Sequence, residues 1–107
     1  MKSILSFLGF GNRREKVSNF LEQDALIVDV RMSGEFKTGN IKGSINVPLE
    51  SIQQSADKIK KYNRPVITCC VSGMRSGFAA SKLRRQGIEA VNGGSWYNVK
   101  LIVDKEI

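Results

Sequence analysis

The sequence has no histidine, and its only two cysteines, Cys69 and Cys70, are adjacent. Adjacent cysteines cannot join distant segments, so the chain must be held by its hydrophobic core, and a free thiol suits a reducing compartment. Two soft ligands without a histidine are too few for a metal site. We therefore expect a cytoplasmic protein with no metal ion and no cofactor.

The sequence also lacks an apolar run long enough to span a membrane. Its 107 residues, of which 41% are hydrophobic and 25% charged, leave room for one domain with a real core. Residues 1–11 are a weak match to a secretory signal, because no small-residue cleavage site follows the apolar run. We interpret residues 1–16 as an N-terminal amphipathic lead-in, with a membrane-surface anchor as the alternative, and residues 17–107 as the domain.

The charge is one-sided, since 17 lysines and arginines outnumber 10 acidic residues and give a formal net charge of +7. Nucleic-acid readers usually add aromatic stacking groups or a recognisable module to a basic stripe, and neither is evident here. We therefore expect solvated helix faces and no nucleic-acid partner. The same charge would steer small anions toward a site.

The most informative stretch is residues 65–76, which read P-V-I-T-C-C-V-S-G-M-R-S. The first five residues have the composition of a strand buried on both faces, and helical spacing begins near Gly77. Between them lies a short loop that starts at Cys70. Loop N–H groups and a helix N-terminus carry partial positive charge and stabilise an anion. The pattern therefore predicts a nucleophilic Cys70 whose pKa lies below the value of about 8.5 for a free cysteine.

Cys69 precedes this loop as the last residue of the expected strand. Strand alternation turns its side chain away from that of Cys70, so we interpret it as a buried apolar residue. A redox pair is the alternative, although a disulfide between neighbours is strained.

Strands and helices alternate along the chain. We expect strands at residues 25–30, 44–47 and 88–91 besides the central one, and helices at 33–37, 49–62, divided at Ser55, and 77–86. This order predicts a parallel sheet covered on both faces, with ligands at the carboxyl ends of the strands, where Cys70 lies. We also expect Phe78 to pack on the sheet, Trp96 to lie over a Gly93–Gly94 turn, and residues 101–103 to be buried in a final helix or tail.

Three stretches resemble the motifs of rhodanese-like domains, a sulfurtransferase family. Residues 70–76, C-V-S-G-M-R-S, resemble the active-site loop C-x-x-G-x-R-S. Residues 28–49 resemble the first signature, D-V-R followed by E-F and by G-H-I-x-G-A-I-N-[VI]-P, and residues 92–96, N-G-G-S-W, resemble the G-G-x-x-x-W region with a shorter spacing. The matches occur in family order. Asn40 stands at the family's usual histidine, a structural position in the family, so this departure bears on packing.

The resemblance implies a single rhodanese-like α/β domain with a small parallel sheet and helices on both faces. It also implies a ping-pong sulfurtransferase. The Cys70 thiolate takes the outer sulfur of thiosulfate or a related anion, sulfite leaves, and the Cys70 persulfide passes the sulfur to cyanide or a thiol. A sulfur-relay protein is a further candidate partner.

The resemblance also assigns roles around the sulfur. The backbone N–H groups of the loop hold the sulfur, Arg75 orders the loop or meets the donor's sulfonate, and Ser72 adds a hydrogen bond. The loop comprises Val71, Ser72, Gly73, Met74, Arg75 and Ser76. Asp29, Arg31 and Glu35 are implied to be structural residues near the site, and we expect Glu35 to meet Arg31.

Two other functions stay open at this point. Cysteine phosphatases and arsenate reductases use a longer loop, C-x5-R, and the span from Cys70 to Arg75 is one residue shorter. Fewer amides around a smaller space fit one sulfur atom better than a phosphate. The other alternative is a rhodanese-like module that binds a partner or carries persulfide to it.

Overall fold

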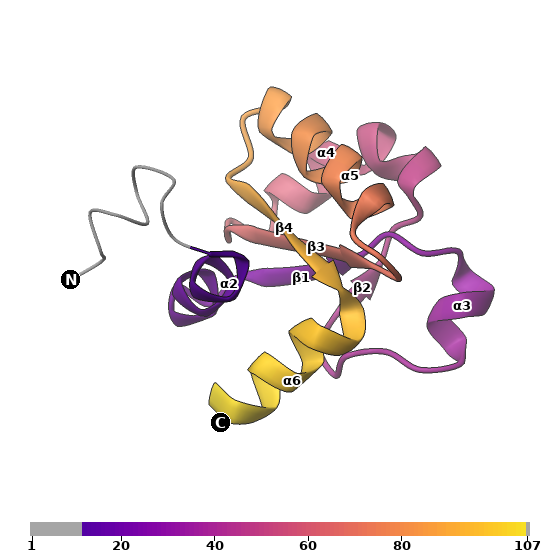
Figure 1. The fold of residues 1–107 in the computed structure, drawn as a ribbon. Coiled ribbons are helices and arrows are strands. Elements are labelled where there is room, and N and C mark those ends of the chain that lie inside the picture. The colour runs from indigo at the N-terminus through magenta and orange to yellow at the C-terminus, as the bar shows by residue number, and fades with distance from the viewer. Residues whose placement is uncertain (1–11, 107) are drawn as a thin grey trace.

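Four parallel strands form the centre of the computed structural model, which describes residues 12–106 (Figure 1). They lie in the order β2-β1-β3-β4, so the third strand of the chain is in the interior of the sheet. All five side chains of β3 are buried, as its β-branched composition predicts. The strands are β1 (Leu26–Asp29), β2 (Ile45–Asn46), β3 (Val66–Cys70) and β4 (Ala90–Ser95).

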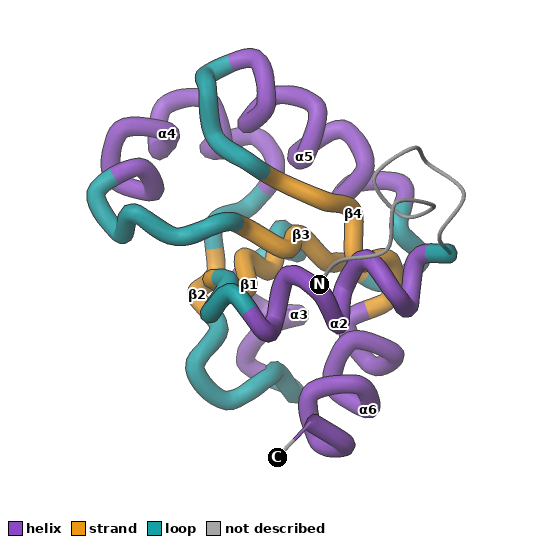
Figure 2. The backbone as a smooth tube through the Cα atoms, turned by 90° about the vertical axis from the view of Figure 1, so that its left-hand side faces the viewer, coloured by secondary structure: helices purple, strands orange, loops and turns teal. Residues whose placement is uncertain are grey.

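Helices cover both faces of this sheet, which confirms the predicted α/β fold (Figures 1 and 2). One face packs against α4 (Ile52–Lys60) and α5 (Met74–Arg85), and the other against α2 (Arg13–Glu22) and α6 (Trp96–Glu106). The short helices α3 (Ser33–Lys37) and η1 (Leu49–Ser51) lie in the connections that follow β1 and β2.

The two apolar cores separate the neighbouring cysteines. Cys70 belongs to the core on the α4 and α5 side, and Cys69 belongs to the core on the α2 and α6 side. This arrangement confirms that strand alternation directs the two side chains to opposite faces.

Three expected boundaries are wrong. The segment after β2 divides at Ser51, where a 3₁₀ turn gives way to α4, and not at Ser55. Helix α5 begins at Met74, three residues before Gly77, because Gly73 supplies a left-handed turn directly ahead of it. The last strand runs through Ser95, so Gly93 and Gly94 lie inside β4 and form no turn.

Two expected burials are also wrong, a third is partial, and Trp96 packs on another residue than expected. Phe78 is exposed, because the helical period that turns Ala79, Ala80 and Leu83 toward the sheet turns Phe78 outward. Leu101 is exposed on α6, Val103 is half-buried, and Ile102 is buried. The Trp96 ring packs on Arg31, whose guanidinium carbon lies 4.5 Å from the ring centroid, and not over the two glycines.

At the start of the described chain, Asn12 caps α2, since its Oδ1 accepts the Glu15 N–H at 2.8 Å. The interpretation of residues 1–11 lies outside the described residues, and the division of the chain at residue 16 stays a prediction. Over residues 12–106, no helix is both long and apolar enough to cross a bilayer.

Candidate active site

Cys70 ends β3 at the carboxyl edge of the sheet, where the chain enters the loop before α5. Its Sγ accepts a hydrogen bond from the Gly73 N–H at 3.0 Å, and it lies 3.4 Å from the Ser76 Oγ. Ser76 is fully buried on the first turn of α5. The loop therefore curls around the sulfur atom and places polar groups against it.

These donors act on the acidity of the thiol. Burial raises the pKa of Cys70, but hydrogen bonds from the Ser76 hydroxyl and from the backbone N–H groups of Ser76, Gly73 and Ser72 outweigh burial and bring the pKa below its ordinary value. Burial raises the pKa of the Cys69 thiol far above its ordinary range. Of the two cysteines, Cys70 alone has the character of a nucleophile.

Gly73 shapes the loop. Its φ of +102° turns its N–H toward the cysteine sulfur, a conformation that glycine adopts without steric cost. A Cβ built at this position would lie 3.2 Å from the Gly94 Cα, because β4 passes close behind the loop. The glycine is thus required by both the backbone angle and the space.

Asn92 on β4 holds the loop in place. Its Nδ2 donates to the Gly73 carbonyl at 3.0 Å, and its Oδ1 accepts from the Ser76 hydroxyl at 2.7 Å and from the Gly94 N–H at 2.9 Å. Thr68 on β3 adds a bond from its hydroxyl to the Ser76 carbonyl at 2.7 Å. One amide therefore ties together the two residues that contact the Cys70 sulfur.

Neither Asn92 nor Thr68 was identified from the sequence as part of the site. Asn92 entered only through its place in the G-G-W match. The sequence signal for Asn92 was a polar side chain directly before two glycines. Its contact with Ser76 on α5 depends on β4 extending through those glycines, which the sequence did not indicate.

The Ser76 hydroxyl has a choice of acceptors. It carries a single proton and faces both the Cys70 Sγ and the Asn92 Oδ1. When Cys70 is a thiolate, Ser76 donates to the sulfur. When Cys70 is protonated, the thiol donates to Ser76 and Ser76 donates to Asn92. In both cases the Gly94 N–H still satisfies the Asn92 oxygen, so the network accommodates either protonation state of the cysteine.

Arg75 is engaged by Glu35. Its two terminal nitrogens donate to the two carboxylate oxygens of Glu35 at 2.8 and 3.1 Å, which links the cysteine loop to α3. The Arg75 guanidinium, together with the Met32 N–H, lowers the pKa of Glu35 to about 2. Of the two roles expected for Arg75, this pairing supports the ordering of the loop. Glu35 meets Arg31 as expected, since the Arg31 Nη1 donates to the Glu35 carbonyl oxygen at 3.2 Å, while the Glu35 carboxylate pairs with Arg75.

Asp29 and Arg31 form a separate buried pair. The Arg31 Nη2 donates to Asp29 Oδ2 at 2.7 Å and to the Gly39 carbonyl at 2.7 Å, and Nε contacts both carboxylate oxygens of Asp29. The pair satisfies two charges that burial would otherwise penalise and fixes the chain after β1. This geometry supports a structural role.

The remaining loop residues contribute backbone more than side chains. Val71, Ser72 and Met74 are exposed, and within the described part of the chain the Ser72 hydroxyl makes no hydrogen bond to the sulfur. Between residues 12 and 106, no three histidine, cysteine or acidic side chains cluster closely enough to hold a metal ion. The site therefore offers a thiol of lowered pKa whose sulfur is surrounded by hydrogen-bond donors.

The family model described as the Rhodanese-like domain matches residues 14–100. The chain belongs to the rhodanese-like domain family. The crystal structure of a rhodanese-like domain protein from Staphylococcus aureus is similar to it with a TM-score of 0.62 and 26% identity, over 81% of this chain and 86% of that one. The predicted family and fold are thus confirmed.

Two curated relatives extend this comparison. The rhodanese-like domain is 37% identical to the uncharacterized protein YqhL of Bacillus subtilis over 76 residues, or 71% of this chain and 56% of YqhL. It is 34% identical to a tRNA sulfurtransferase of Thermoplasma acidophilum over 70 residues, or 65% of this chain and 14% of that enzyme. The chain therefore spans about half of the first relative and a small part of the second. The name of the second relative supports a sulfur-transfer family.

Proposed function

We propose that this protein is a sulfurtransferase that carries sulfane sulfur as a persulfide on Cys70. The observation that supports this function best is the placement of the Cys70 sulfur against the Gly73 N–H and the Ser76 hydroxyl, with its pKa below the ordinary value. A lowered pKa favours the thiolate without help from a general base, so the absence of histidine from the sequence is no obstacle.

The reaction has two steps. The Cys70 thiolate attacks the outer sulfur of thiosulfate, the bond between the two donor sulfurs breaks, and sulfite leaves with the electron pair. A persulfide anion remains on Cys70. Cyanide or a thiolate then attacks the terminal sulfur and restores the Cys70 thiolate. Loop N–H groups stabilise the charge on sulfur in both steps, as an oxyanion hole stabilises oxygen.

The surroundings of Arg75 favour sulfur over phosphate as the transferred group. A phosphoryl group brings three charged oxygens, each of which needs a donor. The Arg75 guanidinium already forms two hydrogen bonds to Glu35, and the loop from Cys70 to Arg75 is one residue shorter than C-x5-R. Both features leave fewer donors for oxygens than a phosphatase loop offers.

A steady-state assay tests this function. We expect the purified protein to form thiocyanate from thiosulfate and cyanide, Cys70→Ser to be inactive, and Cys69→Ser to keep most of the activity. We expect no useful hydrolysis of aryl phosphates. The contrary result is that the unmodified protein hydrolyses aryl phosphate, Cys70→Ser does not, and no thiocyanate forms. The protein would then be assigned as a cysteine phosphatase and not as a sulfurtransferase.

A further inference from the structure

Large apolar side chains surround the cysteine loop on the surface. The exposed fractions are 53% for Val71, 73% for Met74, 61% for Phe78 and 52% for Met32. Met74 and Phe78 lie one turn apart on the same side of α5. Met32 borders the loop from α3, since its N–H binds the Glu35 carboxylate that pairs with Arg75. Apolar side chains gathered around one site are typical of an interaction surface.

Positive charge continues from this apolar group along α5. Arg85 lies two helical turns after Phe78 on the same side of α5. Along the helix axis, Arg85 is about 16 Å from Met74. Beside it, Arg13, Lys16 and Arg84 line a hollow of about 340 Å³ between α2 and α5, with Asn92 and Val91 also in its lining. A Cβ built on Gly73 would lie 3.5 Å from the Arg13 guanidinium, so this charge reaches the loop.

Within the side chains that the structure describes, these cations have no acidic partner of their own. Among the side chains described for residues 12–105, no ion pair joins Arg13, Lys16, Arg84 or Arg85 to a carboxylate. Residues 1–11 contain no aspartate or glutamate. A partner that pairs with these cations would therefore bring negative charge.

We propose that the exposed side of α5, with Lys16 and Arg13 beside it, docks an acidic protein whose cysteine accepts the sulfur from Cys70. We call this surface the α5 face. The inference rests on the proposed function. Phosphates of a nucleic acid would satisfy the cations but would leave Met74 and Phe78 without a partner, whereas an acidic protein with an apolar patch beside its cysteine satisfies both. A small thiol needs only the loop and does not reach Phe78 or Lys16.

The transfer step is balanced without any added oxidant or reductant. The partner's thiolate attacks the terminal sulfur of the Cys70 persulfide, and a sulfur–sulfur bond forms on the partner. The bond to the Cys70 Sγ breaks, and its electron pair returns to Cys70 as the thiolate. One sulfur atom moves and the number of charges is unchanged.

Two synthetic peptides of equal length test the inference. Each has one cysteine flanked by leucines; the first carries glutamates at the far end and the second carries lysines there. The protein is loaded with thiosulfate, and the rate of sulfur transfer to each peptide and to β-mercaptoethanol is measured. We expect the acidic peptide to react about fivefold faster than the basic one at low salt, and we expect this ratio of rates to be smaller at high salt.

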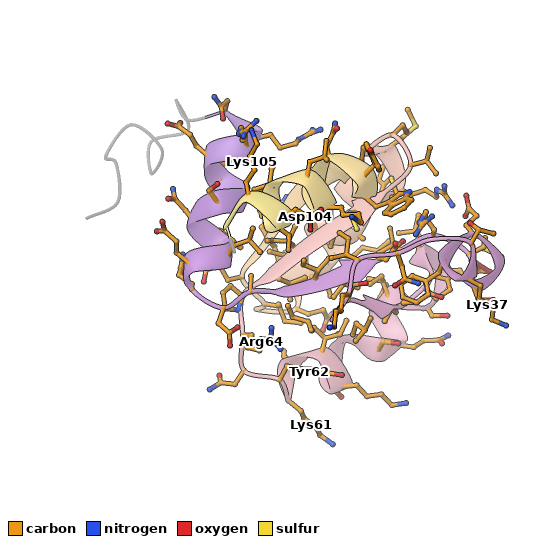
Figure 3. All side chains as sticks on the ribbon, turned by 90° about the horizontal axis from the view of Figure 1, so that it is seen from below. Lys37, Lys61, Tyr62, Arg64, Asp104 and Lys105 are labelled. Carbon is orange, nitrogen blue, oxygen red and sulfur yellow. The ribbon has the colours of Figure 1, made fainter. Side chains whose placement is uncertain are left out.

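Point variants locate the surface. We expect Phe78→Ser and Lys16→Glu each to slow transfer to the acidic peptide and to leave transfer to β-mercaptoethanol unchanged. Lys61→Glu is the matched control, because the Lys61 side chain extends from the end of α4 on the side of the molecule away from α2 (Figure 3). This control should behave like the unmodified protein with all three acceptors.

Each other outcome has a distinct meaning. Failure to load with thiosulfate would overturn the proposed function. Normal loading and normal transfer to β-mercaptoethanol, without a preference for the acidic peptide, would overturn the docking inference alone. If bulk tRNA inhibits peptide transfer, and Lys16→Glu relieves the inhibition while Phe78→Ser does not, the α5 face binds RNA. If the protein sediments as a dimer that Phe78→Ser dissociates, the α5 face binds a second copy. Either result would also overturn the docking inference.

Discussion

Cys69 and Cys70 differ in chemistry although they are neighbours and both are buried. Burial raises the pKa of a thiol in either position, because it disfavours the charged form. Only Cys70 points to the side from which Gly73, Ser72 and Ser76 direct donors at its sulfur. The difference arises from strand alternation and from the loop that follows.

Ser76→Ala tests the contribution of the buried hydroxyl. The variant removes a donor to the Cys70 thiolate, so the pKa of Cys70 should rise. Because the thiolate is the reactive form, its alkylation by iodoacetamide should be slower near neutral pH and should reach the rate of the unmodified protein only at higher pH. The measurement is the alkylation rate as a function of pH. Ser81→Ala, the same change further along α5, is the control, and an unchanged midpoint in Ser76→Ala would remove the hydroxyl from the account of Cys70.

Residues close together in the sequence were predictable at this scale, and residues brought from other elements were not. Cys70, Gly73 and Ser76 lie in one short stretch, so strand, loop and helix signals place them together. Asn92 reaches the same atoms from another strand, and its role follows from the exact path of β4. The pairing of Arg75 with Glu35 likewise depends on where α3 lies relative to α5, which local patterns do not specify.

At the scale of elements, β4 explains why a pair of glycines forms no turn. Adjacent glycines usually indicate a turn, but glycine in a strand also marks a close approach of another chain segment. A Cβ built on Gly93 would lie 2.7 Å from Ile67 Cγ2, 2.8 Å from the Thr68 carbonyl oxygen and 2.9 Å from Val99 Cγ2. The absence of a side chain at Gly93 lets β4 and α6 pack directly on β3.

Gly93→Ala should therefore destabilise the fold, because the backbone oxygen of Thr68 cannot move aside as a flexible side chain can. We expect a loss of about 1–3 kcal/mol in the free energy of unfolding, the usual cost of overpacking. Urea unfolding followed by circular dichroism provides the measurement.

Gly34→Ala is the control for this change. It lies in α3, where a Cβ would meet nothing within 4 Å, so the same substitution should leave stability unchanged or raise it slightly. If Gly93→Ala were as stable as Gly34→Ala, the close packing of β4 on β3 would be refuted.

The helices show a similar division between what the sequence predicts and what it does not. The spacing of Ala79, Ala80 and Leu83 on α5 correctly predicts the buried side of that helix. Phe78 was expected on that side because it is apolar, yet the helical period turns it outward. Residue type alone was a poor guide, and the exposure of Phe78 has a physical explanation once a partner is considered.

At the scale of the whole molecule, the carboxyl edge of the parallel sheet collects the parts of the site. Cys70 arrives from β3, Asn92 from β4 and Glu35 from the segment after β1. The alternation of strands and helices predicts this edge as the place of the site, because all parallel strands end there. The order of the strands and the contacts between elements depend on packing across the whole chain, and they became clear only from the structure.

The mass of the intact protein after exposure to thiosulfate tests most directly whether Cys70 carries the sulfur. We predict that the unmodified protein and Cys69→Ser each gain the mass of one sulfur atom and lose it on addition of cyanide. Cys70→Ser should gain nothing. Sulfur bound by Cys70→Ser, or no added mass on the unmodified protein, would contradict a persulfide on Cys70.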